Sequence, residues 1–180
     1  MMSDITVGLD SLSFESGLSE CEKPFLFLKA RYTGLVLCSC AHAAFFVKLI
    51  HAVRLRVLKG HGSLRSKVSC LHLSADDGIL KVGVLGGGHI GKQLTKVLLQ
   101  FTNLRPGNLK VSSRGPVGKN DLKILGVECF YDNRRLAAWA DVLFLCCLPS
   151  HLSRVCAEIQ SELSQSCIVY SFVSAVPVPR

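Results

Sequence analysis

The chain has 180 residues, of which 49% are hydrophobic, and a formal net charge of +8 at pH 7. This length holds one domain of ordinary size and some additional sequence, and the apolar content is sufficient for a hydrophobic core. The positive charge is a hint about partners, but no nucleic-acid-binding motif accompanies it and aromatic residues are not interleaved with the basic ones, so the sequence argues against nucleic-acid binding.

Residues 1–78 predict an N-terminal extension, mainly helical or irregular, whose charge changes along its length. Acidic residues gather before residue 23, whereas residues 23–75 contain nine Lys or Arg and no Asp or Glu. A basic amphipathic helix is predicted there, because apolar and basic residues follow separate helical stripes. The stripes are Phe46, Leu49, Ile50, Val53 and Val57 on one side and Lys48, His51 and Arg54 on the other. We expect this helix to pack on the following domain or to bind a membrane surface or an acidic partner.

The extension argues against a membrane-spanning helix and against a metal site. Its apolar stretch at residues 34–47 is about 14 residues long, whereas roughly 20 are needed to cross a bilayer, and Lys48 interrupts the continuation. Cys38, Cys40 and His42 lack the spacing of a structural zinc site. We therefore predict no transmembrane segment and no bound metal, and we interpret the Gly- and Ser-containing stretch that follows, at residues 60–74, as a linker.

Nine cysteines, an odd number, are spread over the chain, and several lie within apolar runs. The N-terminus is acidic and polar and lacks the pattern of a signal peptide. We therefore expect reduced thiols in the cytoplasm or another reducing intracellular compartment. Cys146 and Cys147 are neighbours in a predicted strand and point to opposite faces, so we interpret them as core packing rather than as a redox pair.

A glycine-rich motif joins a predicted strand at residues 79–85 to a predicted helix that begins at His89. Gly86, Gly88 and Gly91 form G-x-G-x-x-G, the fingerprint of a dinucleotide-binding βαβ unit. In that unit the first glycine permits a tight turn, the second lets the backbone approach a pyrophosphate, and the third lets the helix pack on the strand. The free N–H groups at the helix start would face the anion. The alternative is a glycine-rich turn that binds no ligand.

The second predicted strand, at residues 109–113, ends without an acidic residue. NAD-binding units usually carry Asp or Glu there, about 20 residues after the glycines, to hold the ribose hydroxyls. Ser112, Ser113 and Arg114 occupy this place instead. Two hydroxyls and the charged fork of a guanidinium suit a 2′-phosphate, so the sequence favours NADP (NADPH) over NAD. The alternative is that Arg114 is a solvated residue at the start of a loop.

Strands and helices go on alternating to residue 173. The remaining predicted elements are helices at Asp121–Leu125, Asn133–Trp139 and around Leu152–Leu163, and strands at Val127–Tyr131, Asp141–Leu148 and Cys167–Val173. This alternation predicts an α/β fold with a doubly wound parallel sheet of the Rossmann type at residues 79–180. A ligand would bind in the crevice beyond the carboxyl ends of the strands.

Together these motifs resemble those of the pyrroline-5-carboxylate reductases. The resemblance covers about residues 79–178 and rests on VGVLGGGHIG, SSR, GVxxxxDN and ADVLFLCCLPS. It implies an NADP-binding domain and, in a complete relative, hydride transfer between the cofactor and a C=N or C=O bond. The cofactor-binding residues that it implies are Gly86, Gly87, Gly88, His89, Ile90, Gly91, Ser112, Ser113, Arg114, Asn133, Cys146, Cys147, Leu148 and Pro149.

The resemblance assigns a role to each of these groups. Residues 86–91 would hold the pyrophosphate, and residues 112–114 would hold the adenosine phosphate. Asn133 would contact the adenosine side of the cofactor, and residues 146–149 would line the approach to the nicotinamide. No residue is identified as catalytic, and the substrate, a small molecule, stays unknown.

Three features depart from the family pattern. Leu148 stands where the reductases usually have Lys, and Ala175 stands where they usually have Gly. The chain also ends at Arg180, whereas a helical C-terminal domain that dimerises and completes the substrate pocket follows in the family. We therefore expect a fragment or truncated isoform that is inactive alone and whose full-length form is a homo-oligomer. The alternative function is a non-catalytic NADP-binding sensor or interaction module.

Overall fold

The computed structural model describes residues 19–21, 23–60, 80–114 and 119–173. Its chain divides into two compact units, Met1–Cys38 and Ser39–Arg180. A short 3-10 helix, η3 (Lys23–Phe25), is followed by the 35-residue helix α1 (Leu26–Gly60), which begins in the first unit and ends in the second. Residues 61–79 lie outside the described residues, so the predicted linker and the predicted domain boundary after residue 78 stay predictions.

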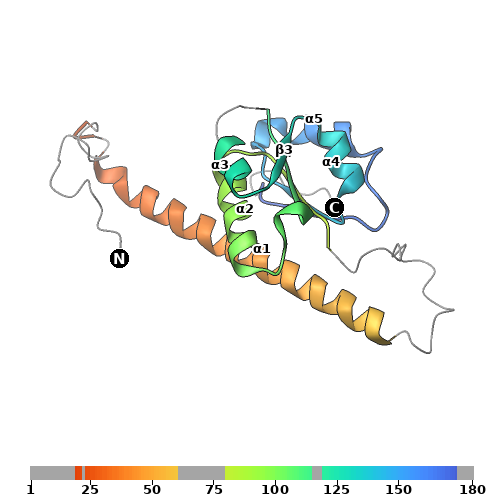
Figure 1. The fold of residues 1–180 in the computed structure, drawn as a ribbon. Coiled ribbons are helices and arrows are strands. Elements are labelled where there is room, and N and C mark those ends of the chain that lie inside the picture. Colours follow the sequence, from red (N-terminus) through yellow and green to blue (C-terminus); the bar gives the residue numbers. More distant parts are fainter. Residues whose placement is uncertain (1–18, 22, 61–79, 115–118, 174–180) are drawn as a thin grey trace, which may run out of the picture. The chain divides into compact units, whose positions relative to one another are not determined.

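Five parallel strands form one sheet in the order β3-β2-β1-β4-β5 (Figure 1). The strands are β1 (Val82–Leu85), β2 (Leu109–Ser112), β3 (Glu128–Phe130), β4 (Val142–Leu145) and β5 (Ile168–Ser171). The helices between them are α2 (His89–Phe101), η4 (Pro106–Asn108), α3 (Lys119–Ile124), α4 (Asn133–Trp139) and α5 (Pro149–Ile159). This order confirms the predicted doubly wound sheet of the Rossmann type.

The two central strands are buried on both faces, because helices cover each side of the sheet. On one face, α4 and α5 pack Leu136 and Ile159 into a cluster with Leu143 of β4. Helix α2 lies on the other face, because a Cβ at Gly91 would be 3.4 Å from Val84. Val84 and Leu143 are on opposite faces of the sheet, because Leu143 pairs with Gly83, the neighbour of Val84. Figure 1 shows α2 and α3 on one side and α4 and α5 on the other.

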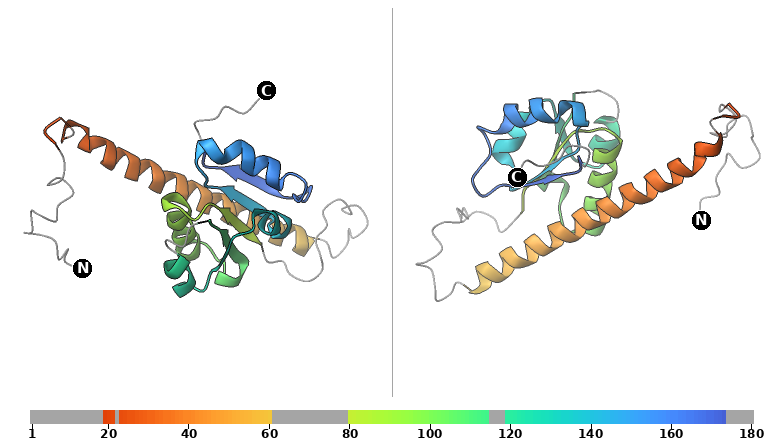
Figure 2. Two further views of the ribbon diagram at one scale, coloured as in Figure 1. Left: turned by 90° about the horizontal axis from the view of Figure 1, so that it is seen from above. Right: turned by 180° about the vertical axis from the view of Figure 1, so that it is seen from behind.

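The second half of α1, within the unit of residues 39–180, packs on the same face as α2, over β4 and β5. There the ring of Tyr170 lies 5.3 Å from that of Phe144 and 5.6 Å from that of Phe46 on α1. The Tyr170 hydroxyl is 2.8 Å from Nδ1 of His42. Figure 2 gives two further views of the helices around the sheet. The α1 side chains buried here are small or β-branched, namely Cys40, Ala43, Ala44 and Val47.

The packing face of α1 differs from the predicted apolar stripe. Leu49 and Val53 of that stripe are about half exposed, at 49% and 51%. The buried positions are instead Cys40, Ala43, Ala44 and Val47, which are three or four residues apart and lie on one helical face. Arg54, seven residues after Val47, lies on the same face. Small side chains let the helix approach the large aromatic rings on the sheet, and this requirement does not appear in the periodicity of the helix itself.

Within the described residues, α1 is long and apolar enough to cross a membrane, with a window of mean hydropathy 1.7. This statement rests on length and composition. The prediction that the chain has no transmembrane segment therefore stays a prediction.

Asp141 connects α1 to the amino-terminal edge of the sheet. Its Oδ2 accepts hydrogen bonds of 2.9 Å from Arg54 Nη1 on α1 and from the backbone N–H of Lys81. The backbone of Asp141 donates to the Lys81 carbonyl at 2.8 Å and accepts from Ile168 N at 2.9 Å. Through its half-buried carboxylate and its backbone, Asp141 thus joins the helix to the starts of β1, β4 and β5.

Replacing this carboxylate should destabilise the fold. We expect Asp141→Ala to lower the free energy of unfolding by about 1–3 kcal/mol, because a guanidinium and a backbone N–H both lose their acceptor. Urea denaturation measures the change. Glu20→Ala, which removes an exposed carboxylate paired with Lys23, is the matched control and should cost less. Equal losses for the two variants would contradict the structural role of Asp141.

Candidate functional site

The residues predicted to form the site meet at the carboxyl edge of the sheet, where the strand order reverses between β1 and β4. Gly86 follows β1 and donates its N–H to the carbonyl of Ser112 at 2.9 Å. Cys146 follows β4 and donates to the carbonyl of Leu85 at 2.8 Å. Such a switch point is where doubly wound sheets bind their ligands.

The first and third glycines of the motif have the conformations that the fingerprint requires. Gly86 has a φ of 110°, and a Cβ there would lie 2.6 Å from the carbonyl oxygen of Cys146. A Cβ at Gly91 would lie 1.8 Å from the carbonyl oxygen of Gly86. Neither position tolerates a side chain, because the opposing atoms belong to the backbone. The tight turn and the close packing of α2 on β1 therefore depend on these two glycines.

Gly88 differs, because its surroundings are open. A Cβ at this residue would meet no atom within 4 Å. Gly88 is the N-cap of α2, and no side chain caps this end of the helix. The space beside the Gly88 backbone is therefore open at the start of a helix, which is the arrangement that accommodates a pyrophosphate. By this test the residues present fit a dinucleotide.

Gly87 has a packing requirement that the sequence pattern did not indicate. The residue is buried, and a Cβ there would lie 2.6 Å from Cβ and 2.7 Å from Oγ of Ser113. The side chain of Ser113 is therefore held against the glycine turn. Its hydroxyl lies beside the motif at the end of β2.

A chain of hydrogen bonds joins the end of β2 to α4 and α5. Ser112 Oγ is 2.7 Å from Asn133 Oδ1, and Asn133 Nδ2 is 3.0 Å from Glu158 Oε2. An ionised carboxylate only accepts, so the NH₂ group of Asn133 must face Glu158 and its oxygen must face Ser112. The single proton of the buried Ser112 hydroxyl is therefore donated to Asn133. Sequence reasoning missed Glu158, because only the side-by-side packing of α4 and α5 brings it to Asn133.

Arg114 lies at the end of β2 and reaches the start of α5. Its Nη2 is 2.8 Å from Nδ1 of His151, which accepts the bond when the ring is neutral. The Arg114 side chain is exposed. Only one nitrogen of the guanidinium is used in this contact, so the other N–H groups can still reach a ligand.

The residues after β4 are apolar or weakly acidic. Burial raises the pKa of the Cys146 thiol and of the Cys147 thiol, so both stay protonated at neutral pH. Leu148 is 63% exposed and precedes Pro149, the first residue of α5. These side chains provide a surface rather than a nucleophile or a base. In the part of the chain that the structure describes, no group of three His, Cys, Asp or Glu residues could hold a metal ion.

Comparison with known proteins agrees with this geometry. The chain is 47% identical over 173 residues to NADP-dependent oxidoreductase domain-containing protein 1 of Mus musculus, and the alignment covers 96% of this chain and 47% of the relative. It is 32% identical over 101 residues to pyrroline-5-carboxylate reductase of Corynebacterium melassecola, and this alignment covers 54% of this chain and 37% of the relative. The solved structure of a pyrroline-5-carboxylate reductase from Coxiella burnetii is 27% identical in sequence and has a TM-score of 0.49. The match covers 52% of this chain and 35% of the reductase chain.

The predicted resemblance to the reductases is thus confirmed, and the chain spans less than half the length of the curated relatives that it matches. Residues 81–174, more than half of the chain, match the family model described as NADP oxidoreductase, coenzyme F420-dependent. The chain therefore belongs to this family of NADP oxidoreductases.

Proposed function

We propose that the carboxyl edge of the sheet forms a cleft that binds NADPH, and that the domain serves an oxidoreductase acting on a C=N or C=O bond. The observation that carries the proposal is the open space over Gly88 at an α2 N-terminus without a side-chain cap. The family match and the pyrroline-5-carboxylate reductase relatives support it. When bound, NADPH supplies the hydride, while the protein supplies binding, orientation and electrostatics.

The phosphates of the nucleotide would have separate partners. The turn at residues 86–91 and the first N–H groups of α2 hold the pyrophosphate. Ser113 and Arg114 hold the 2′-phosphate, because both lie beyond the end of β2 and both have donors to offer. Ser112 acts indirectly, since its proton is donated to Asn133. Asn133, fixed in orientation by Glu158, bounds the adenosine side of the cleft.

Residues 146–149 would line the approach to the nicotinamide. Burial raises the pKa of both the Cys146 and the Cys147 thiol, so we propose neither as a nucleophile or a base. The role of these residues is to shape the site and to exclude water. We propose that the protein is a homo-oligomer.

The second candidate function is an NADPH-binding module without turnover. Exposed Leu148 at the end of β4, where related reductases usually have Lys, favours it. Oxidation of NADPH in the presence of pyrroline-5-carboxylate distinguishes the two functions. Substrate-dependent oxidation by the full-length protein supports the reductase, whereas tight NADPH binding without oxidation supports the module. We propose a reducing intracellular compartment for either, because Cys38, Cys40, Cys146, Cys147, Cys156 and Cys167 form no disulfide.

Arg114 should determine the preference for NADPH over NADH. We expect Arg114→Ala to weaken NADPH binding by about 1.5–3 kcal/mol, or roughly 10- to 100-fold, because a charge-assisted bond to the 2′-phosphate is lost. NADH binding should change little. Fluorescence titration with both nucleotides measures the effect, and Arg154→Ala, at an exposed position of α5, is the control. Equal affinity of the unaltered chain for both nucleotides would contradict the proposal.

The two serines should respond differently to substitution. Ser113→Ala should reduce the affinity for NADPH relative to NADH, because it removes a donor to the 2′-phosphate. Ser112→Ala should mainly lower the free energy of unfolding, by about 1–2 kcal/mol, because it leaves Asn133 without its buried partner. Nucleotide titration and urea denaturation of both variants separate these effects. A loss of NADPH preference in Ser112→Ala alone would reverse the assignment.

Gly88→Val should abolish NADPH binding while the sheet stays folded. The branched side chain would enter the open space over the α2 N-terminus, where its Cβ meets no atom within 4 Å. Gly91→Ala should instead perturb the fold, since its Cβ would collide with the Gly86 carbonyl oxygen. Circular dichroism combined with nucleotide titration tests both variants. Retained NADPH binding in Gly88→Val would show that the glycine motif is only a turn.

A further inference from the structure

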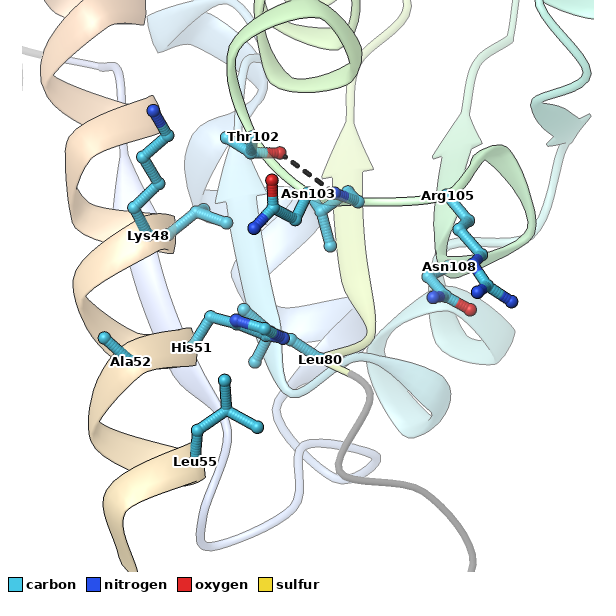
Figure 3. Close-up of a pocket in the computed structure, with 11 residues that line it drawn as sticks. Lys48, His51, Ala52, Leu55, Leu80, Thr102, Asn103, Arg105 and Asn108 are labelled. Carbon is cyan, nitrogen blue, oxygen red and sulfur yellow. Dashed lines mark hydrogen bonds between the residues drawn. The ribbon is translucent and has the colours of Figure 1, made fainter.

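A pocket lies at the amino-terminal edge of the sheet, opposite the proposed NADPH cleft (Figure 3). One wall is the second half of α1, and the other is the segment from Thr102 to Asn108 between α2 and β2. Leu80, just before β1, lies between the two walls. The volume is about 580 Å³, within the range of roughly 300–1,000 Å³ that small-molecule sites occupy.

Part of the lining is apolar. Leu55 is 37% exposed and presents hydrophobic surface, whereas Val47 and Leu80 belong to the lining but are each only 1% exposed. Burial of the apolar body of a ligand against this surface would stabilise a complex. A small hydrophilic ion alone would leave the surface in contact with water.

The rest of the lining is basic or polar. Lys48 and His51 come from α1, while Asn103, Arg105 and Asn108 come from the opposite wall, as Figure 3 shows. None of the lining residues is acidic.

The carboxylate of Asp141, which also contacts α1, is already engaged. It accepts from Arg54 and from the Lys81 backbone. The pocket thus combines an apolar surface with positive charge from two separate elements, and no carboxylate of its lining neutralises that charge.

We propose that this pocket binds a small amphiphilic anion, in which a phosphate or carboxylate head is attached to an apolar body. The head contacts Lys48 and Arg105, and the body lies against Leu55 and the other exposed apolar parts of the lining. The site is separate from the NADPH cleft, because the two lie at opposite ends of β1, whose four residues span about 13 Å. Both ligands therefore bind at the same time.

Octyl phosphate, used below its micelle concentration, is a suitable probe for the 180-residue chain. Amide chemical shifts in NMR spectra report where it binds, with and without saturating NADPH. We expect saturable shifts at residues 47–55 and 102–108 that persist with NADPH. Octanol and inorganic phosphate each lack one half of the ligand and should bind at least tenfold more weakly.

Two charge-removing variants test the head-group contacts. Lys48→Gln and Arg105→Gln should each weaken octyl phosphate binding about tenfold, as expected for the loss of one charge-assisted bond. Arg154→Gln, on the other face of the sheet, should have no effect. The proposal is overturned if octanol binds as well as octyl phosphate, or if all three variants behave alike. It is also overturned if the shifts map to residues 26–38 or 86–91, or if no saturable binding is seen.

Discussion

The close approach of α2 to the end of β1 is the constraint on which the nucleotide-binding edge of the molecule depends. The N-terminal turn of the helix lies against the turn that ends the strand, so that a single methyl group at Gly91 would be 1.8 Å from a backbone oxygen. The same turn brings Gly86 against the backbone that follows β4.

The two edges of the sheet are organised by different kinds of contact. At the carboxyl edge, hydrogen bonds through Asn133 fix the side chains around the cleft. At the amino edge, Asp141 joins the second half of α1 to the strands through a half-buried ion pair. The helix thereby covers aromatic rings of β4 and β5. Residues 39–60 are therefore part of the folded unit that holds the sheet, and they contribute one wall of a pocket.

The sequence predicted the sheet and the positions of the glycines well, because both depend on local patterns. Alternating apolar strands and helices imply a parallel sheet, and G-x-G-x-x-G between such elements has a specific backbone requirement. The sequence did not predict contacts that depend on packing between distant elements. Glu158 reaches Asn133 only because α4 and α5 lie side by side. Asn133 is thereby oriented to accept the hydrogen bond from Ser112, so the Ser112 proton is not available to a phosphate. The packing face of α1 was predicted only in part for the same reason. Phe46 of the predicted stripe contacts Tyr170, but the small residues Cys40, Ala43 and Ala44 are buried outside that stripe.

The account holds that the nucleotide lies over the α2 N-terminus with its 2′-phosphate at the end of β2. A crystal structure of the chain with bound NADPH tests this claim most directly. The account predicts the pyrophosphate over Gly88 and the 2′-phosphate within hydrogen-bond distance of Ser113 and Arg114, with Ser112 still bonded to Asn133. A nucleotide bound elsewhere, or a 2′-phosphate that contacts neither Ser113 nor Arg114, would contradict it.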